Sequence, residues 1–176
     1  AFEQTAGTVD ASGSTLTLGA ASTVAGTVKA TTIANGGVTL TQTDGTINAD
    51  AVNGAFEQTG GTIDKLSGTT LAFGSTVEQN QADGSVAQIG GAGTTVEIAG
   101  KLTQTAGTVD ASGSTLTLNT ASTVAGTVKA TTIANEGVTL TQEGGTIGES
   151  GKALEITGAF EQTAGTVDAS GSTLTL

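Results

Sequence analysis

Seven amino acids are absent from this 176-residue chain: cysteine, methionine, tryptophan, tyrosine, histidine, proline and arginine. The lack of cysteine excludes a disulfide framework and thiol chemistry, and the lack of histidine removes the most common general base. The only aromatic residues are Phe2, Phe56, Phe73 and Phe160. Because large aromatic side chains supply much of the buried area of an ordinary globular core, this core must be thin and filled by small and β-branched residues.

Positive charge is also scarce, since five lysines stand against 16 acidic residues and give a formal net charge of −11. Phosphate binding needs clustered basic residues, so we expect no nucleic-acid partner. The lysines are isolated, and we interpret them as edge charges: Lys29, Lys65, Lys101, Lys129 and Lys152. No stretch is apolar enough for a transmembrane segment. No signal peptide is recognisable, so we expect a mature protein or a section of a longer one.

One phrase, AFEQTAGTVDASGSTLTL, organises the chain. It occupies residues 1–18 and returns unchanged at residues 159–176. Blocks 1–42 and 101–142 are nearly identical, and residues 75–100 form the most divergent coil, where we expect a longer loop. Such close repetition is typical of a stacked architecture in which each unit contacts its neighbours. We therefore interpret residues 1–176 as a single repetitive domain.

The most regular mark of the repeat is Gly-Thr-(Val/Ile), and the mean step between its copies is about 20 residues. Thr- and Val-rich segments between glycines favour strands over helices, and the asparagine ladder of leucine-rich repeats is missing. The sequence predicts an all-β fold, a parallel β-helix (β-solenoid) of about nine coils of roughly 20 residues. Its expected corner glycines are Gly7, Gly26, Gly45, Gly61, Gly107, Gly126, Gly145 and Gly165.

Alternation within each coil separates inward from outward residues. In Gly7-Thr8-Val9-Asp10-Ala11, Val9 and Ala11 point one way and Thr8 and Asp10 the other. The predicted structural core column is Val9, Val28, Ile47, Ile63, Val86, Val109, Val128, Ile147 and Val167. A matching outer column is Thr8, Thr27, Thr46, Thr62, Ser85, Thr108, Thr127, Thr146 and Thr166.

The outer position of Asp10 shows how charge is distributed along the stack. The next copies of this position hold Lys29, then Asn48, and the second block repeats the order with Asp110 and Lys129. Stacked carboxylates one coil apart would repel each other, and this arrangement avoids them. Each exposed opposite-charge pair contributes less than about 1 kcal/mol.

Few side chains of this sequence could act in catalysis or bind a metal, and we predict no catalytic, cofactor-binding or metal site. Asp10 or Asp64 with neighbouring carboxylates would be needed for a polysaccharide-cleaving enzyme, but acids that recur with the repeat are typical of a solvated surface. Glu78, Asn80 and Asp83 lie near the tip of the expected loop, where a metal is less expected than a solvated loop. Ice binding by regular threonine arrays is a further option, although ordinary β propensity explains the threonine content more simply.

The motifs Gly-Thr-Val-x-Ala, Ser-Thr-Leu-Thr-Leu and Thr-Leu-Thr-Gln-x-x-Gly-Thr-Ile carry a resemblance over the whole chain. The chain resembles the repetitive passenger regions of bacterial filamentous-haemagglutinin-like and autotransporter surface adhesins. This resemblance implies a right-handed parallel β-helix, secretion to the cell surface, and a role as a stalk, adhesin or matrix fibre. It transfers no functional residue, because those families place binding in loops and added domains that have no match here.

From these observations we expect an extracellular structural protein, a rod that is part of a fibre, surface stalk or biofilm filament, and not an enzyme. The alternative is an adhesin that contacts glycans, ice or another cell through an outer face or the 75–100 loop. The chain begins and ends inside a repeat, so we expect open β edges, which invite pairing. The expected partners are copies joined end to end, or further repeats of the same chain.

Overall fold

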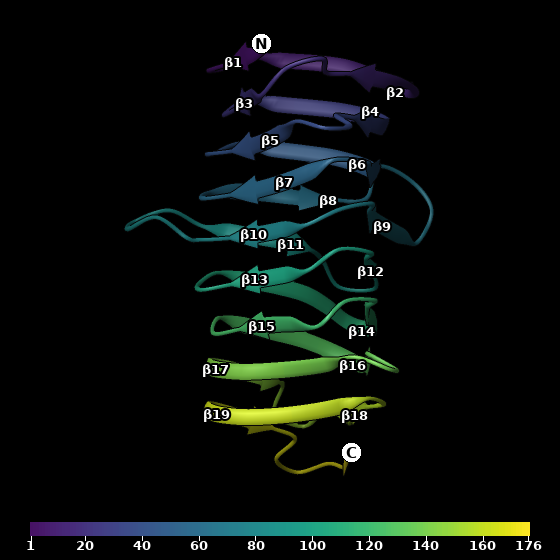
Figure 1. The fold of residues 1–176 in the computed structure, drawn as a ribbon, viewed down its shortest axis with the longest axis vertical. Helices are drawn as coiled ribbons and strands as arrows, with labels where there is room; N and C mark the ends of the chain where they lie inside the picture. The colour runs from purple at the N-terminus through teal and green to yellow at the C-terminus, as the bar shows by residue number, and fades with distance from the viewer.

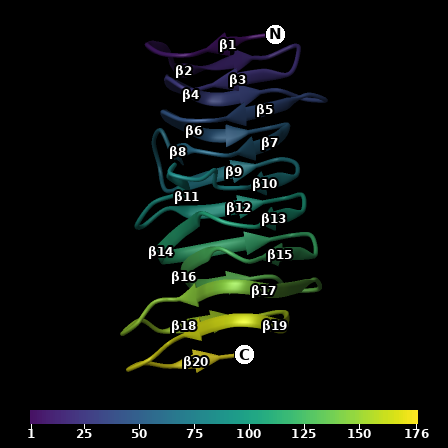
Figure 2. The same cartoon turned by 90° about the vertical axis from the view of Figure 1, so that its left-hand side faces the viewer.

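The structure, a computed structural model, describes all residues from 1 to 176 and contains only strands joined by turns and loops. The chain winds into a β-solenoid of about nine turns whose strands all pair in parallel (Figure 1). The turned view shows the turns lying on one another from the N-terminus to the C-terminus (Figure 2). The predicted fold class is therefore confirmed. We number the coils 1 to 9, spanning residues 1–20, 21–37, 38–54, 55–74, 75–100, 101–120, 121–137, 138–158 and 159–176.

Each coil supplies a strand, or half of a long strand, to each of three parallel ladders. The first ladder contains β1 (Glu3–Gln4), β3 (Ser22–Val24), β5 (Thr39–Gln42), β7 (Ala55–Gln58), β10 (Val77–Gln79), β13 (Leu102–Gln104), β15 (Ser122–Val124), β17 (Thr139–Gly148) and β19 (Ala159–Asp168). The second contains β2 (Thr8–Thr17), β4 (Thr27–Ala34), β6 (Thr46–Val52), β8 (Gly61–Asp64), β11 (Ala87–Gly90), β14 (Thr108–Leu118), β16 (Thr127–Ala134) and the later halves of β17 and β19. The third joins the later halves of β2, β4, β6, β14 and β16 to β9 (Thr70–Phe73), β12 (Thr95–Ile98), β18 (Leu154–Ile156) and β20 (Leu174–Thr175).

The interior is a single narrow column of aliphatic side chains. Alternate residues of each strand point inward, so β4 alternates half-buried and buried positions along its first half. The buried apolar residues form one continuous cluster that runs through all the interior coils. Coil 4 holds the one aromatic pair, with the rings of Phe56 and Phe73 5.3 Å apart. Small and β-branched residues therefore fill the bore, as the composition indicates.

The ladder register places eight of the nine predicted column residues on one another, from Val9 to Val167. The exception is Val86, and that prediction is wrong. In coil 5 the column position belongs to Ile89, which pairs with Ile63 on one side and Val109 on the other. Ile89 is fully buried, whereas Val86 is 65% exposed.

The outer column contains the same error, because Gln88 and not Ser85 lies between Thr62 and Thr108. The cause is an extra loop at residues 80–86. Gly84-Ser85-Val86 resembles the Gly-Thr-(Val/Ile) motif of the repeat. Gly84, however, has a φ of 77° and lies within a turn of the loop. The Ser85 amide closes this turn by donating to the Ala82 carbonyl. The strand begins only at Ala87, so the true column residue comes three positions later.

The predicted corner glycines all lie between the first and second ladders, and six of them have positive φ: Gly7, Gly45, Gly61, Gly107, Gly145 and Gly165. Gly26 and Gly126 do not, and close packing explains them instead. A Cβ at Gly26 would lie 2.8 Å from both Gln4 Nε2 and the Gly7 carbonyl oxygen. The corner glycines thus meet two different demands, left-handed backbone and close approach of neighbouring coils.

The contrast between Ile89 and Val86 gives a direct test of the register. We expect Ile89→Asp to destabilise the fold by more than about 4 kcal/mol, because it buries an unpaired charge. Val86→Asp introduces the same charge on an exposed side chain, so its effect should stay within about 0.5 kcal/mol. Thermal unfolding of the two variants measures the difference. Equal melting temperatures would contradict the register of coil 5.

Candidate functional site

A ladder of buried glutamines lines the corner between the first and second ladders. Glutamines occupy the last first-ladder position before this corner in seven coils: Gln4, Gln42, Gln58, Gln79, Gln104, Gln142 and Gln162. All except Gln162, in the terminal coil 9, are at most 6% exposed. Their amide groups supply polar partners inside an otherwise apolar bore.

The glutamines connect coils to one another through their side chains. The Nε2 groups of Gln58, Gln79 and Gln104 each donate to the Oε1 of the glutamine one coil before, at 2.8 to 3.0 Å. Each Nε2 also donates to corner carbonyls, as Gln58 does to Gly61 and to Gln88 of the next coil. Some of these corner carbonyls accept twice, as the Gly7 carbonyl does from Gln4 Nε2 and from the Thr27 amide of the next coil.

Valine interrupts the glutamine ladder at Val24 and Val124. The buried Oε1 atoms of Gln4 and Gln104 face these valines in the next coil and have no hydrogen-bond partner. In both valine coils the corner is one residue shorter than the Gln-x-x-Gly corner of the other copies. This ladder was not predicted from the sequence, although the recurring Gln-x-x-Gly-Thr spacing was the signal for it.

Buried asparagines perform the same task at the corner between the third and first ladders. Asn35 Nδ2 donates to the carbonyls of Val38 and Ala55, and its Oδ1 accepts from the Gly54 amide at 2.8 Å. Asn135 repeats this pattern with Val138, Ala159 and Gly158. Each asparagine thereby joins its own coil to the next.

Aspartates form the third kind of corner, between the second and third ladders. The Ser12 amide donates to Asp10 Oδ1 at 2.9 Å, and Asp110 and Asp168 accept in the same way from Ser112 and Ser170. Hydrogen bonds from the Ser12 side chain and amide hold the pKa of Asp10 below its usual value, and Lys29 adds a smaller contribution. Ser170 lowers the pKa of Asp168 in the same manner. These aspartates are local turn anchors.

A longer connection at residues 65–69 joins β8 to β9, and Asp50 of coil 3 anchors it. The carboxylate of Asp50 accepts from the amides of Leu66 and Ser67 and from the Ser67 hydroxyl, at 2.7 to 2.9 Å. Burial alone would raise the pKa of Asp50, but these bonds outweigh it, and the pKa is lowered. Beside this loop, Lys65 and Asp64 form the one ion pair, at 3.9 Å.

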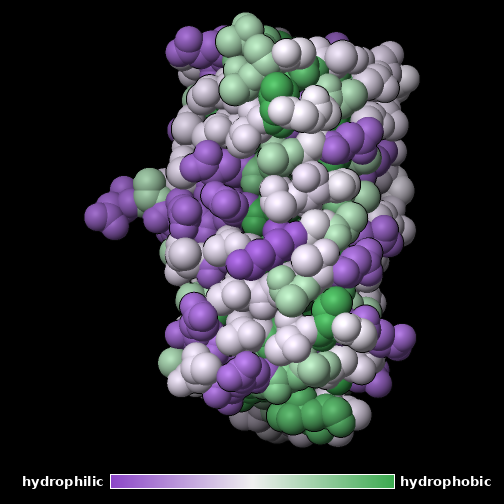
Figure 3. All heavy atoms as spheres, viewed as in Figure 1, coloured by the Kyte–Doolittle hydropathy of each residue, from purple (hydrophilic) through white to green (hydrophobic).

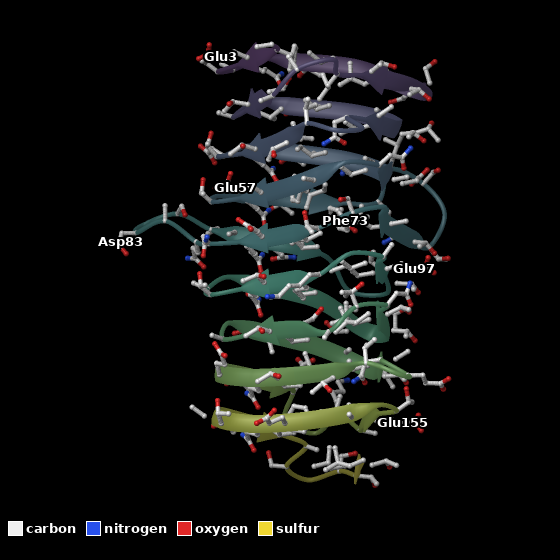
Figure 4. The ribbon with its side chains drawn as sticks, in the orientation of Figure 1. Glu3, Glu57, Phe73, Asp83, Glu97 and Glu155 are labelled. Carbon is white, nitrogen blue, oxygen red and sulfur yellow. The ribbon has the colours of Figure 1, made fainter.

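The loop at residues 80–86 is the largest departure from the smooth rod. It projects sideways between β10 and β11, with Asp83 at its outer end (Figures 1 and 4). Asn80 lies at its base, where its Oδ1 accepts from the Thr105 hydroxyl. Glu78, which the sequence analysis also placed near the tip, instead points outward from strand β10. Glu78 and Asp83 therefore do not belong to one site.

Neither Asp10 nor Asp64, each considered with a neighbouring carboxylate, pairs with another acid in its column: Asp10 lies next to Lys29, and Asp64 lies next to Asn48. Asp10 and Asp64 occupy the same outer column, separated by Lys29 and Asn48. Three coil steps of about 4.8 Å put them about 14 Å apart, beyond the spacing that glycosidase carboxylates require. Lys29 and Lys129 lie next to Asp10 and Asp110 in this column, as the sequence indicates, although neither pair comes within ion-pair distance.

One pair of acids contradicts the expectation that stacked carboxylates are avoided. Glu57 and Glu78 are direct neighbours on the first ladder. Both point outward on the side of the rod where Figure 4 labels Glu57. Neither belongs to one of the two surface hollows.

The surface offers no developed binding pocket. The larger hollow, of about 340 Å³, lies beside the insertion at residues 149–152 and contains one carboxylate, of Glu149, and one ammonium group, of Lys152. No group of three or more acidic side chains is placed to hold a metal ion. The structure contains no helix that could serve as a membrane span.

Comparison with known proteins gives no match: no family model, no curated protein and no solved structure is similar to this chain.

The glutamine ladder predicts a strong dependence on position. Gln79→Leu should destabilise the fold by about 2–4 kcal/mol, because it leaves the Gln58 side-chain oxygen and the carbonyls of Ala87 and Thr108 without their donor. Gln162→Leu makes the same change at an exposed position and should cost less than about 0.5 kcal/mol. Chemical denaturation measures both. A Gln79→Leu variant as stable as the parent chain would show that the ladder is not structural.

Proposed function

We propose that this chain is a secreted structural protein, a β-solenoid rod that forms part of an extracellular fibre, surface stalk or biofilm-matrix filament. The observation that carries the proposal is the continuous stack of nine coils with shared ladders, in which glutamines and asparagines at the corners bond one coil to the next. A rod of this kind acts by its length and stiffness, and it needs no catalytic group.

Repetition suits such a role, because each coil contacts mainly its two neighbours and stability accumulates coil by coil. The side chains that are buried and polar bind to backbone groups of their own coil and the adjacent coil. The length of the rod can therefore change by whole coils without redesign of a distant contact.

The resemblance to filamentous-haemagglutinin-like and autotransporter passenger regions supports placement at the cell surface. An acidic surface, with a net charge of −11, also keeps neighbouring rods apart in solution. Both arguments favour a solvated exterior filament over an enzyme.

A second candidate is an adhesin, and the loop at residues 80–86 favours it. This loop breaks the repeat, projects from the rod, and leaves Val86 65% exposed. Replacing residues 80–86 with the Thr-Ala of residues 105–106 would restore the short corner of the other coils. Glycan-array binding that disappears with this replacement would favour an adhesin that binds through the loop, whereas a parent chain that binds no glycan would favour the purely structural role.

Negative-stain electron microscopy of the native material tests the structural role. We expect unbranched rods or filaments of nearly uniform width, because every coil contributes to the same three ladders. Isolated globular particles in the native material would contradict the proposal.

A further inference from the structure

The first and last coils expose apolar side chains that the interior coils bury. Phe2, Val9 and Leu16 of coil 1 are only partly buried, and in coil 9 Leu174 is 42% and Leu176 is 74% exposed. Figure 3 shows a hydrophobic area at the lower end of the rod. The column equivalents of Val9 in coils 2 to 8 are fully buried. Both edges thus present a core cross-section with open strand edges.

These two coils have the same sequence, so the molecule itself shows how each face of that sequence pairs. In coil 1 the face toward the C-terminus pairs with coil 2, with Glu3 opposite Thr23 and Val9 opposite Val28. In coil 9 the other face pairs with coil 8, with Phe160 opposite Leu140. The edge that is free in one copy of the phrase is therefore occupied in the other copy.

A buried polar atom without a partner lies beside the exposed edge of coil 9. Gln142 Oε1 is buried without a partner, although Gln162 follows it in the ladder. The Gln162 side chain is exposed and donates only to the Gly165 carbonyl of its own coil. In the interior, glutamines covered on both sides donate to the glutamine before them. Covering coil 9 would place Gln162 in the same environment.

From these observations we propose that copies of this chain join end to end, with coil 1 of one copy stacked in register on coil 9 of another. Phe2 then lies on Phe160, Val9 on Val167, and Gln4 donates to Gln162 so that the glutamine ladder continues across the junction. The inference rests on the proposed function, since it states how the rods of a fibre would join.

The same register places two pairs of acids against each other. Glu3 stacks on Glu161, and Asp10 stacks on Asp168. The other neighbours of the glutamates are Thr23 and Thr141, and those of the aspartates are Lys29 and Gly148. Only Lys29 relieves this repulsion. Low pH or high salt therefore favours the junction, and because serine hydrogen bonds lower the pKa of Asp10 and Asp168, these aspartates stay charged to more acidic pH than usual.

Neutralising one side of the junction tests the proposal without a change of pH. At neutral pH and low salt, the parent chain should sediment as single rods. The double variant Glu3→Gln with Asp10→Asn should at least double the average sedimenting mass and give longer rods in electron micrographs. The matched control, Glu97→Gln with Asp83→Asn, removes the same two charges from exposed positions away from the ends and should remain single.

A third variant separates stacking at the edge from general association. Adding Val9→Lys to the Glu3→Gln, Asp10→Asn chain puts a charge into the junction and should return it to single rods. The proposal is overturned if the neutralised variant stays single while circular dichroism shows its strands intact, or if the control associates equally. If the native material forms filaments but the neutralised variant remains as single rods, the proposed junction is wrong while the structural role stands. If the native material consists of globular particles, the structural role is wrong.

Discussion

All strand pairing in this chain joins one coil to the next, and no two strands of the same coil pair with each other. A coil therefore has no stable sheet of its own and depends on in-register contact with its neighbours. The parallel ladders run along the rod axis and place equivalent residues above one another. This constraint explains why inner positions repeat as Val or Ile and outer positions repeat as Thr. Each side chain packs against the side chain at the equivalent position of the next coil.

The corners are where this arrangement is most demanding, because the chain must turn while its carbonyl groups remain buried. Glutamine at the first corner and asparagine at the third donate to carbonyls, whereas at the second corner an exposed aspartate accepts from a serine amide and fixes the turn. Because the same amide links its own coil and the next, the corner also sets the register. The scarcity of large aromatic residues follows from the same geometry, since a bore this narrow accepts few rings.

Sequence periodicity predicted most of the fold, because inward and outward residues alternate so regularly around Gly-Thr-Val. It failed in coil 5, where Gly84-Ser85-Val86 has the local pattern of a corner but belongs to a projecting loop. Only the pairing of Ile89 with Ile63 and Val109 decides which residue enters the column. That pairing joins residues far apart in the sequence, so the local pattern cannot reveal it. The ladder of interior glutamines was also missed, because the partners of these side chains lie in neighbouring coils and are known only from the register. The Glu57–Glu78 stack was missed because Glu78 was expected near the loop tip, whereas it lies on β10 directly opposite Glu57.

The central claim is that coils follow one another at a constant rise with equivalent threonines in line, and distances between spin labels test it most directly. The chain has no cysteine, so Thr27→Cys can be combined with Thr108→Cys, Thr127→Cys or Thr166→Cys without background labelling. At about 4.8 Å per coil, we predict backbone separations of roughly 19, 24 and 34 Å for the three pairs. Distances that do not increase with coil number, or that place Thr166 close to Thr27, would contradict the stacked solenoid.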